Sequence, residues 1–379
     1  MRKLIAVFLI LGITSVAYSQ RERNYSLFIE NVFSQGEVLK TNDFVRGLNQ
    51  RGIPISDFTA SDTRVGWQTR GTQQWHHNLK LPYYGIGFFN SLFSHQEEIG
   101  HPTALYFFFG GPFISKLKSS FDYEFGFGLS SNWKPYDELE NPFNLAIGSY
   151  MNAFIDFKIG YSWYLGKKFS LNAGVRATHF SNGALRHPNS GINLLSPFVG
   201  LRYDFIARED LINSIPTPEE DTPTEEFNIG IVLGERSVKH TTTRNIKSVS
   251  LKSLSLGYLK PGGGVFRYGL GLDVGIDENR WITVKEDSVE LAPFKNQLFL
   301  GIAPIGQFRV NRLALQAGVG YELLSGGKFV KNQFYQRVGL RYYLSDHLFA
   351  GIAIKATNFS RADYIEWSLG FNLKRAKGE

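Results

Sequence analysis

Residues 153–165 read Ala-Phe-Ile-Asp-Phe-Lys-Ile-Gly-Tyr-Ser-Trp-Tyr-Leu, and this stretch decides the fold class. Every second residue from Ala153 onwards is apolar or aromatic, whereas the positions between them include Asp156 and Lys158. Successive side chains of a β-strand point to opposite faces, so the alternation predicts a strand with one apolar and one polar face. Residues 121–129 repeat the pattern, with acids and glycines between large apolar side chains.

The same alternation predicts sixteen antiparallel strands along the chain. The first eight are expected at 24–34, 61–70, 83–93, 103–115, 119–131, 150–165, 168–181 and 194–205. The other eight are expected at 227–238, 246–260, 264–276, 296–308, 312–323, 333–344, 347–359 and 363–374. Short turns alternate with longer loops between them, as in a barrel whose turns lie on one side of a membrane and whose loops lie on the other. The connection 71–82 is too long for a turn of this scheme.

The composition is typical of an outer-membrane β-barrel. The 379 residues include 39 glycines and 15% aromatic residues, and the mean hydropathy is −0.17. This balance fits a barrel with an apolar outer wall and a polar lumen. The absence of cysteine excludes disulfides and thiolate metal sites, and we expect neither a metal nor a cofactor. The net charge of +7 suits contact with anionic lipid headgroups, whereas a nucleic-acid partner is not expected of an exported barrel.

The first residues have the pattern of a secretory signal peptide. Arg2 and Lys3 form a charged region, residues 4–13 form a short apolar region, and residues 17–19 form a small-x-small cleavage site. The apolar region is too short for a spanning helix, and no later stretch has the ~20 continuous apolar residues that such a helix needs. We therefore expect a chain that is exported to the cell outer membrane.

The two halves of the chain resemble each other. Residues 177–181 read Ala-Thr-His-Phe-Ser, residues 356–360 read Ala-Thr-Asn-Phe-Ser, and each segment precedes a last alternating strand. Between the halves, residues 209–226 carry seven acids, no bases and three prolines, which predicts a flexible linker. We expect two tandem eight-strand barrels, with one fused barrel of about 14–16 strands as the alternative. The expected domains are a signal peptide at 1–19, a barrel unit at 20–207, an acidic Pro-rich linker at 208–226 and a second barrel-like repeat at 227–379.

Polar residues interrupt the apolar face where the strand 168–181 ends. By alternation His179 and Ser181 share the outer, apolar face of this strand, and Asn193 has the same parity on the returning strand. A serine hydroxyl becomes a nucleophile when a base takes its proton, and the base needs a third group to orient it. We therefore predict Ser181 as the nucleophile, His179 as the base and Asn193 as the orienting group.

Two points of this constellation stay open. Asn193 can accept a hydrogen bond from the imidazole, but it lacks the charge that would stabilise an imidazolium, and an acid from the 137–140 loop could orient His179 instead. Asn182, Gly183 and Asn189 are candidates to stabilise the oxyanion of an ester under attack, through backbone or side-chain amides. These are the catalytic and substrate-binding residues that the sequence suggests.

The pattern of these residues matches a known family. His-x-Ser-Asn at 179–182 is followed by Pro-Asn-x-Gly at 188–191, near the end of an expected eight-strand unit. The chain here resembles the outer-membrane lipid A 3-O-deacylases of the PagL type, and residues 137–144 look like loops of bacterial acyloxyacyl hydrolases. The resemblance implies Ser181 as nucleophile, His179 as base and Asn189 as an oxyanion-hole residue. The triad acid of that family is a glutamate at the position that Asn193 occupies here.

Two functions compete for this sequence. The first is an outer-membrane serine esterase that removes an ester-linked acyl chain from lipid A or a related membrane lipid. The second is a non-enzymatic barrel that acts as a pore, a binding protein or a scaffold, which the departure at Asn193 favours. In the second half Asn358 replaces the histidine, so Ser360 has no base, and we expect that repeat to be non-catalytic.

Overall fold

The structure is a computed structural model that describes residues 25–183, 185–208, 224–239, 245–280, 282–284, 288–325, 334–357 and 361–376. These residues form two closed antiparallel β-barrels of eight strands each. The predicted all-β fold and the tandem pair of barrels are therefore confirmed, and the alternative of a single fused barrel is wrong. The predicted signal peptide at 1–19, most of the linker at 208–226, and Asn358 and Ser360 lie outside the described residues.

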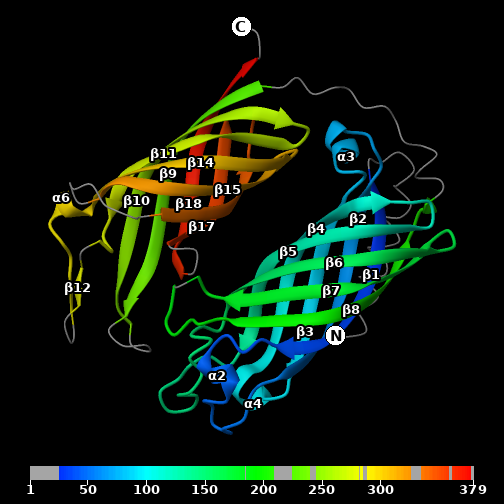
Figure 1. The fold of residues 1–379 in the computed structure, drawn as a ribbon, viewed down its shortest axis with the longest axis horizontal. Coiled ribbons are helices and arrows are strands. Elements are labelled where there is room, and N and C mark those ends of the chain that lie inside the picture. The colour runs from blue at the N-terminus through cyan, green and yellow to red at the C-terminus, as the bar shows by residue number, and fades with distance from the viewer. Residues whose placement is uncertain are drawn as a thin grey trace, which may run out of the picture. The chain divides into compact units, whose positions relative to one another are not determined.

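The first barrel is an up-and-down barrel in which each strand pairs with the next along the chain (Figure 1). Its strands are β1 (Tyr25–Val38), β2 (Asp57–Thr69), β3 (Tyr83–Phe93), β4 (Gly100–Ser115), β5 (Ser119–Trp133), β6 (Asn152–Leu165), β7 (Phe169–Ser181) and β8 (Ile192–Asp204). Pairing of β1 with β8, from Phe28 opposite Asp204 to Val38 opposite Leu194, closes the barrel. A closed barrel leaves no strand edge unpaired, as a wall in contact with lipid requires.

Short helices lie at both ends of this barrel. Helices α2 (Asp43–Arg46) and α4 (Gln96–Ile99) lie at one end, which we call the loop end, and α3 (Gln74–Asn78) lies at the other, the turn end (Figure 1). Helix α3 explains why the connection 71–82 exceeds a turn, since it folds back on the barrel. His76 of α3 is buried against the Tyr25 ring, and this burial lowers the pKa of its imidazole to about 4. Among the described residues, no helix is long and apolar enough to cross a membrane.

The strand alternation separates an apolar wall from a charged lumen. Along β7, Val175 is 54% exposed on the outer wall, whereas its neighbour Arg176 is 1% exposed inside the barrel. Arg176 binds Asp62 of β2 at 2.5 Å and Asp156 of β6 at 2.8 Å. The side chains around Arg176 are almost fully buried, so each charge there needs a partner from another strand.

A second set of ion pairs continues the lumen network towards the turn end. Arg64 of β2 pairs with Glu30 of β1 at 2.6 Å and also with Glu124 of β5, and it lies 3.9 Å from the centre of the Phe108 ring. Lys158 of β6 pairs with the same Glu124 at 3.1 Å. The charges therefore tie together strands that lie far apart around the barrel wall.

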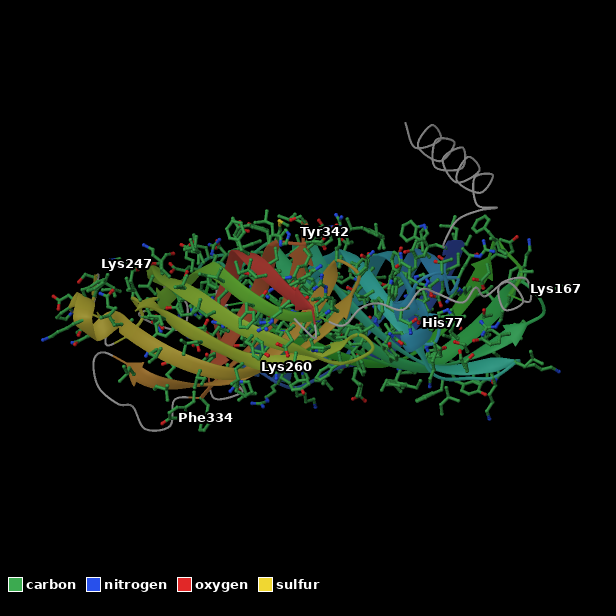
Figure 2. The ribbon with its side chains drawn as sticks, turned by 90° about the horizontal axis from the view of Figure 1, so that it is seen from above. His77, Lys167, Lys247, Lys260, Phe334 and Tyr342 are labelled. Carbon is green, nitrogen blue, oxygen red and sulfur yellow. The ribbon has the colours of Figure 1, made fainter. Side chains whose placement is uncertain are left out.

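The second barrel is closed in the same way by β9 pairing with both β10 and β18. Its strands are β9 (Thr224–Lys239), β10 (Asn245–Gly263), β11 (Phe266–Asp277), β14 (Leu298–Val310), β15 (Leu313–Ser325), β16 (Phe334–Tyr343), β17 (Leu348–Thr357) and β18 (Arg361–Ala376). A two-stranded hairpin of β12 (Thr283–Val284) and β13 (Val289–Glu290), and helix α6 (Phe294–Gln297), lie in the connection between β11 and β14. Large apolar side chains again face outwards, such as Tyr342 and Phe334 of β16 (Figure 2).

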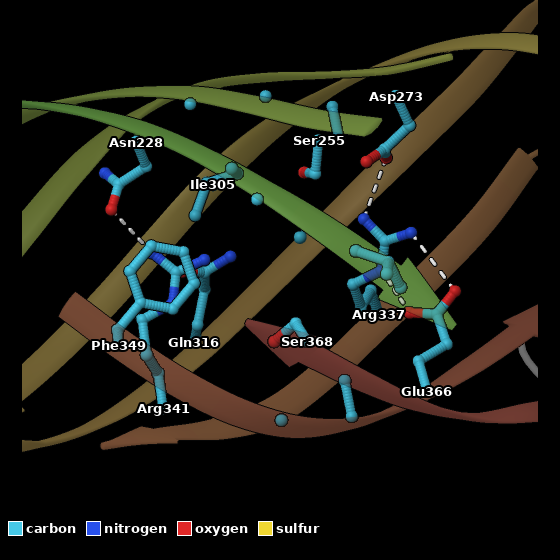
Figure 3. Close-up of a pocket in the computed structure, with 18 of the residues that line it drawn as sticks. Asn228, Ser255, Asp273, Ile305, Gln316, Arg337, Arg341, Phe349, Glu366 and Ser368 are labelled. Carbon is cyan, nitrogen blue, oxygen red and sulfur yellow. Dashed lines mark hydrogen bonds and ion pairs between the residues drawn. The ribbon is translucent and has the colours of Figure 1, made fainter. Parts of the chain in front are cut away.

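The lumen of the second barrel has its own ion pairs. Arg337 bridges Asp273 at 2.8 Å and Glu366 at 2.6 Å, as Figure 3 shows. Arg341 donates to the Asn228 side chain at 2.9 Å and lies 3.9 Å from the centre of the Phe349 ring. These side chains line a cavity of about 70 Å³.

Substitution of Arg176 tests the role of the lumen network. Arg176→Met leaves the carboxylates of Asp62 and Asp156 buried without their guanidinium, so we expect a loss of roughly 3–5 kcal/mol in the free energy of unfolding. The measurement is denaturant unfolding of the folded protein in detergent, followed by tryptophan fluorescence. Four of the six tryptophans, at 67, 75, 133 and 163, belong to the first barrel and report on it.

Arg46→Met is the matched control for this experiment. Arg46 pairs with Asp43 in α2, where both side chains are more than half exposed, so its loss should cost about 1 kcal/mol or less. Equal effects of the two substitutions would contradict a stabilising role for the lumen ion pairs.

Candidate active site

The end of β7 presents His179 and Ser181 on the outer face of the first barrel. Both side chains are partly exposed, whereas Phe180 between them is fully buried in the lumen. Phe180 packs on Trp133 with ring centres 4.8 Å apart and on Phe154 at 5.5 Å. This aromatic packing fixes the pleat at the end of the strand, so His179 and Ser181 must point outwards, as the alternation predicts.

His179 and Asn193 lie directly opposite each other in the pairing of β7 with β8. The Nδ1 atom of His179 lies 2.7 Å from Oδ1 of Asn193. An amide oxygen only accepts hydrogen bonds, so Nδ1 carries the proton and donates to it. The lone pair of the imidazole is then at Nε2, which is the atom that a general base uses in a triad of this kind.

Asn193 is itself held by residues that follow β1. Its Nδ2 group donates to Oγ1 of Thr41 at 2.9 Å, and the Thr41 hydroxyl donates to the Leu39 carbonyl at 3.4 Å. The backbone N–H of Leu39 donates to the Asn193 carbonyl at 2.8 Å, which extends the ladder of β1 and β8 by one bond. The sequence carries no signal for this contact, since Thr41 and Asn193 are 152 positions apart.

Gly191 lets the chain pass close to the His179 ring. Its φ is +74°, a left-handed conformation that glycine adopts without strain. A Cβ at this position would lie 3.0 Å from Cε1 of His179 and 3.0 Å from the Phe180 carbonyl oxygen. Any larger residue would therefore press on the imidazole, which gives a steric reason for the glycine of the Pro-Asn-x-Gly segment.

Asn182 organises the loop after Ser181. Its side-chain Nδ2 donates to the Arg186 carbonyl at 2.8 Å and to the Ser149 hydroxyl at 3.2 Å. Its backbone N–H donates to Oδ1 of Asn189 at 2.9 Å. The donors of Asn182 are thus used within the loop, whereas the structure gives Nδ2 of Asn189 no partner among the described residues. Gly183 has a φ of +63° and makes the turn at the start of this loop.

The loop between β5 and β6 supports the loop that holds Asn189. The Ser190 N–H donates to the Leu145 carbonyl at 3.3 Å, and a Cβ on Gly148 would lie 2.3 Å from the Pro188 carbonyl oxygen. In the 137–140 loop, the Asp137 carboxylate accepts the N–H groups of Glu140 and Leu139, which lowers its pKa. Asp137 therefore stabilises its own turn.

The described residues contain no group of three or more His, Asp or Glu side chains arranged to hold a metal ion. The sequence pattern predicts His179, Ser181, Asn182, Gly183, Asn189 and Asn193 as site residues, and all six lie in or directly beside the loop that joins β7 to β8. It does not indicate Thr41 and Ser149, which come from other connections at the same end of the barrel.

The solved structures that the chain matches share little sequence with it. The chain is similar to CdiB from Acinetobacter baumannii, with 11% identity over 93% of this chain and 60% of CdiB, and a TM-score of 0.19. The chain thus spans less than two thirds of CdiB. It is also similar to the toluene transporter TodX from Pseudomonas putida, with 9% identity, 95% and 90% coverage and a TM-score of 0.17. TM-scores this low carry no argument, and no curated protein matches the chain.

Comparison with protein families is more specific. The family described as lipid A 3-O-deacylase (PagL) matches residues 61–202, which include all six predicted site residues. The family described as acyloxyacyl hydrolase, C-terminal domain, matches residues 225–375, the second barrel. Together the two matches run from β2 of the first barrel to β18 of the second, and the β-barrel fold and these families fit an outer-membrane protein. The chain belongs to the PagL and acyloxyacyl hydrolase family, whose named activities are hydrolysis of acyl esters.

Proposed function

We propose that this protein is an outer-membrane serine esterase that removes an ester-linked acyl chain from lipid A or a related membrane lipid. The single observation that carries the proposal is the 2.7 Å hydrogen bond from His179 to Asn193 on the outer wall, two residues before Ser181. Such a bond fixes the tautomer in which the imidazole can take a proton from a hydroxyl. We assign the site to the barrel unit at 20–207 and a non-catalytic role to the repeat at 227–379.

The chemistry proceeds through an acyl-enzyme. Oγ of Ser181 attacks the ester carbonyl carbon while Nε2 of His179 takes the hydroxyl proton. The tetrahedral intermediate collapses, the C–O bond to the lipid breaks, and the imidazolium returns the proton to the departing alkoxide as an alcohol. Water then attacks the acyl-enzyme with His179 again as base, which releases a fatty acid and regenerates Ser181. These steps balance without a redox partner.

Asn189 is our candidate for the side-chain donor to the oxyanion. Its Oδ1 accepts from the Asn182 N–H, which turns its Nδ2 group away from that bond. Asn182 uses its own amide on Arg186 and Ser149, so we assign it the task of holding the loop. A donor fixed in advance of the reaction stabilises charge as it develops, which is the main effect of an oxyanion hole.

The position of the site indicates a substrate that lies in the membrane. Val175 and Leu195, on the strands that carry the site, are 54% and 42% exposed on the outer wall. An acyl chain lying along this wall would bring its ester to the rim, where a polar headgroup meets water. This position favours a lipid ester over a water-soluble one, because the site lies on the apolar outer wall.

The lumen of the first barrel gives less support to the alternative function of a pore. The first barrel has a cavity of about 640 Å³ at its turn end, lined by residues such as Arg202 and Asn172. Towards the loop end, however, the ion pairs of Arg64 and Arg176 and then the packed rings around Phe180 fill the lumen. A filled lumen is typical of small barrels that do not conduct solutes.

Substitution of Ser181 and His179 tests the esterase. Ser181→Ala and His179→Asn should each lower deacylation by roughly 1,000-fold or more, because each removes one member of a nucleophile and base pair. The double variant should be no more than a few-fold slower than either single variant, since such a pair acts as one unit. The measurement is mass spectrometry of lipid A and phospholipids from cells that contain each variant, read as the loss of one acyl mass.

The controls are Ser61→Ala and His101→Asn, which change exposed residues on β2 and β4 away from the site. Both should keep full activity, and all variants should show the electrophoretic mobility of a folded barrel. Additive losses from Ser181→Ala and His179→Asn would contradict their joint action, and unchanged lipid profiles with the native protein would contradict the esterase itself.

Asn189→Asp separates the two tasks of Asn189. The carboxylate can still accept the Asn182 N–H and hold the loop, but it offers no donor to an oxyanion. We expect kcat to fall roughly 100-fold or more with little change in KM, in line with the loss of one oxyanion donor. A variant with native kcat would show that Asn189 only positions the loop.

A further inference from the structure

We propose that Thr41 is a positioning residue that sets the tautomer of His179 by fixing which way the Asn193 side-chain amide faces. This inference rests on the proposed function and deepens it. Thr41 lies outside the segment that matches the deacylase family, which begins at residue 61, and its contact with Asn193 is visible only in the folded barrel.

The need for such a residue follows from the chemistry of an amide. Asn193 can present either its oxygen or its NH₂ group to Nδ1 of His179 after a half-turn about its last side-chain bond. If the oxygen faces the ring, Nδ1 is protonated and Nε2 carries the lone pair that a base needs. If the NH₂ group faces the ring, Nδ1 must accept, so the proton moves to Nε2 and the base is lost. A carboxylate has two equivalent oxygens and no such ambiguity.

Thr41 favours the productive arrangement because its hydroxyl hydrogen is already used. The hydroxyl donates to the Leu39 carbonyl over a long bond of 3.4 Å, and in this arrangement it offers a lone pair to Asn193. The Asn193 NH₂ group meets this lone pair at 2.9 Å, which leaves Oδ1 facing His179 at 2.7 Å. In the reversed arrangement an amide oxygen would face an oxygen lone pair, with no hydrogen between them unless the hydroxyl gave up Leu39.

The segment around Thr41 is fixed on both sides. Before it, the Leu39 N–H donates to the Asn193 carbonyl at 2.8 Å. After it, Nδ2 of Asn42 donates to the Gly191 carbonyl at 2.7 Å, while Oδ1 of Asn42 caps helix α2 by accepting the Val45 N–H at 3.1 Å. Both anchors bind the segment from Gly191 to Asn193, so Thr41 keeps its place beside the amide while the reaction proceeds.

The experiment combines Thr41→Val with Asn193→Asp. Valine keeps the size of threonine but removes the hydroxyl, so Thr41→Val should lower kcat by ~5- to 10-fold with KM unchanged, about the effect of one lost hydrogen bond. Thr41→Ser keeps the hydroxyl and should retain the native rate. In the Asn193→Asp background the same Thr41→Val change should alter kcat by less than ~2-fold, because both oxygens of a carboxylate can accept the hydrogen bond from Nδ1. Rates are compared at the alkaline plateau of each pH profile, since a carboxylate beside an imidazole favours its protonated form.

Thr63→Val is the matched control. The Thr63 hydroxyl also bonds an asparagine side chain across two strands, donating to Oδ1 of Asn31 at 3.1 Å, but it lies away from the site. Its loss should leave kcat unchanged in both backgrounds. If Thr41→Val lowered kcat equally with and without the Asn193→Asp change, the inference would be overturned and a general structural effect indicated.

A spectroscopic readout keeps this inference separate from the proposed function. In protein labelled with ¹⁵N-histidine in detergent micelles, the ring nitrogens report the tautomer directly, and His179→Gln identifies the His179 signals among the 8 histidines. We expect the Nδ1-protonated form in the native protein and in Thr41→Ser, and a shift towards the Nε2-protonated form in Thr41→Val. An unchanged tautomer in Thr41→Val would overturn the role of Thr41, whether or not the protein deacylates lipid. Absence of lipid deacylation with the expected tautomer shift would instead contradict the esterase alone.

Discussion

The buried ion pairs of the first lumen are the constraint on which the rest of this barrel depends. Arg176 alone joins β2, β6 and β7 through Asp62 and Asp156. These side chains are almost fully buried, so their charges are stable only when the opposite strands hold their register. A slip of one residue in a strand would turn the inward charges of that strand out to the apolar wall and leave their partners unpaired, which makes the register of the barrel cooperative.

The site inherits its geometry from this register. Because the lumen fixes Arg176 and Phe180 on the inside, the residues of opposite parity must lie on the outside, and these include His179 and Ser181. The same register places Asn193 opposite His179 across the pairing of β7 and β8. The proposed site on the outer wall is therefore positioned by the ion pairs and aromatic packing on the inner face of the same strands.

Much of the fold could be predicted from the sequence because side chains of a barrel strand alternate between the lumen and the outer wall. Alternation located all sixteen barrel strands and the outward parity of the site residues, and the confirmed fold follows from that one signal. The ends of the strands were predicted less accurately. Strand β1 continues to Val38 and β2 begins at Asp57, so the loop between them is shorter at both ends than the predicted 35–60. Helix α3 was not predicted, because a five-residue helix has too few residues to show a period.

The contacts between loops lie beyond sequence reasoning for a different reason. The bonds from Asn182 to Ser149 and from Asn193 to Thr41 join side chains from separate connections, and their partners have no periodic signature. They are set by where closure of the barrel brings the ends of β1, β6 and β8. Local patterns indicate the six proposed site residues, whereas Ser149 and Thr41, which bond Asn182 and Asn193, emerge only from the closed fold.

In the triad that we propose, the orientation of the Asn193 side chain matters more than the orientation of an acid would. A carboxylate at the rim would stabilise the imidazolium, but it would also place a charge on a wall that borders the membrane, where desolvation is costly. An amide avoids that cost and keeps the hydrogen bond to Nδ1 of His179. It gives up charge stabilisation of the imidazolium, and either its oxygen or its NH₂ group can face the ring. A hydroxyl that accepts a hydrogen bond from the NH₂ group keeps the amide oxygen facing the imidazole. The Thr41 hydroxyl accepts from Asn193 and donates to the Leu39 carbonyl. In such a site the third member of the triad is best understood as a pair of residues, an amide and the hydroxyl that determines which way it faces.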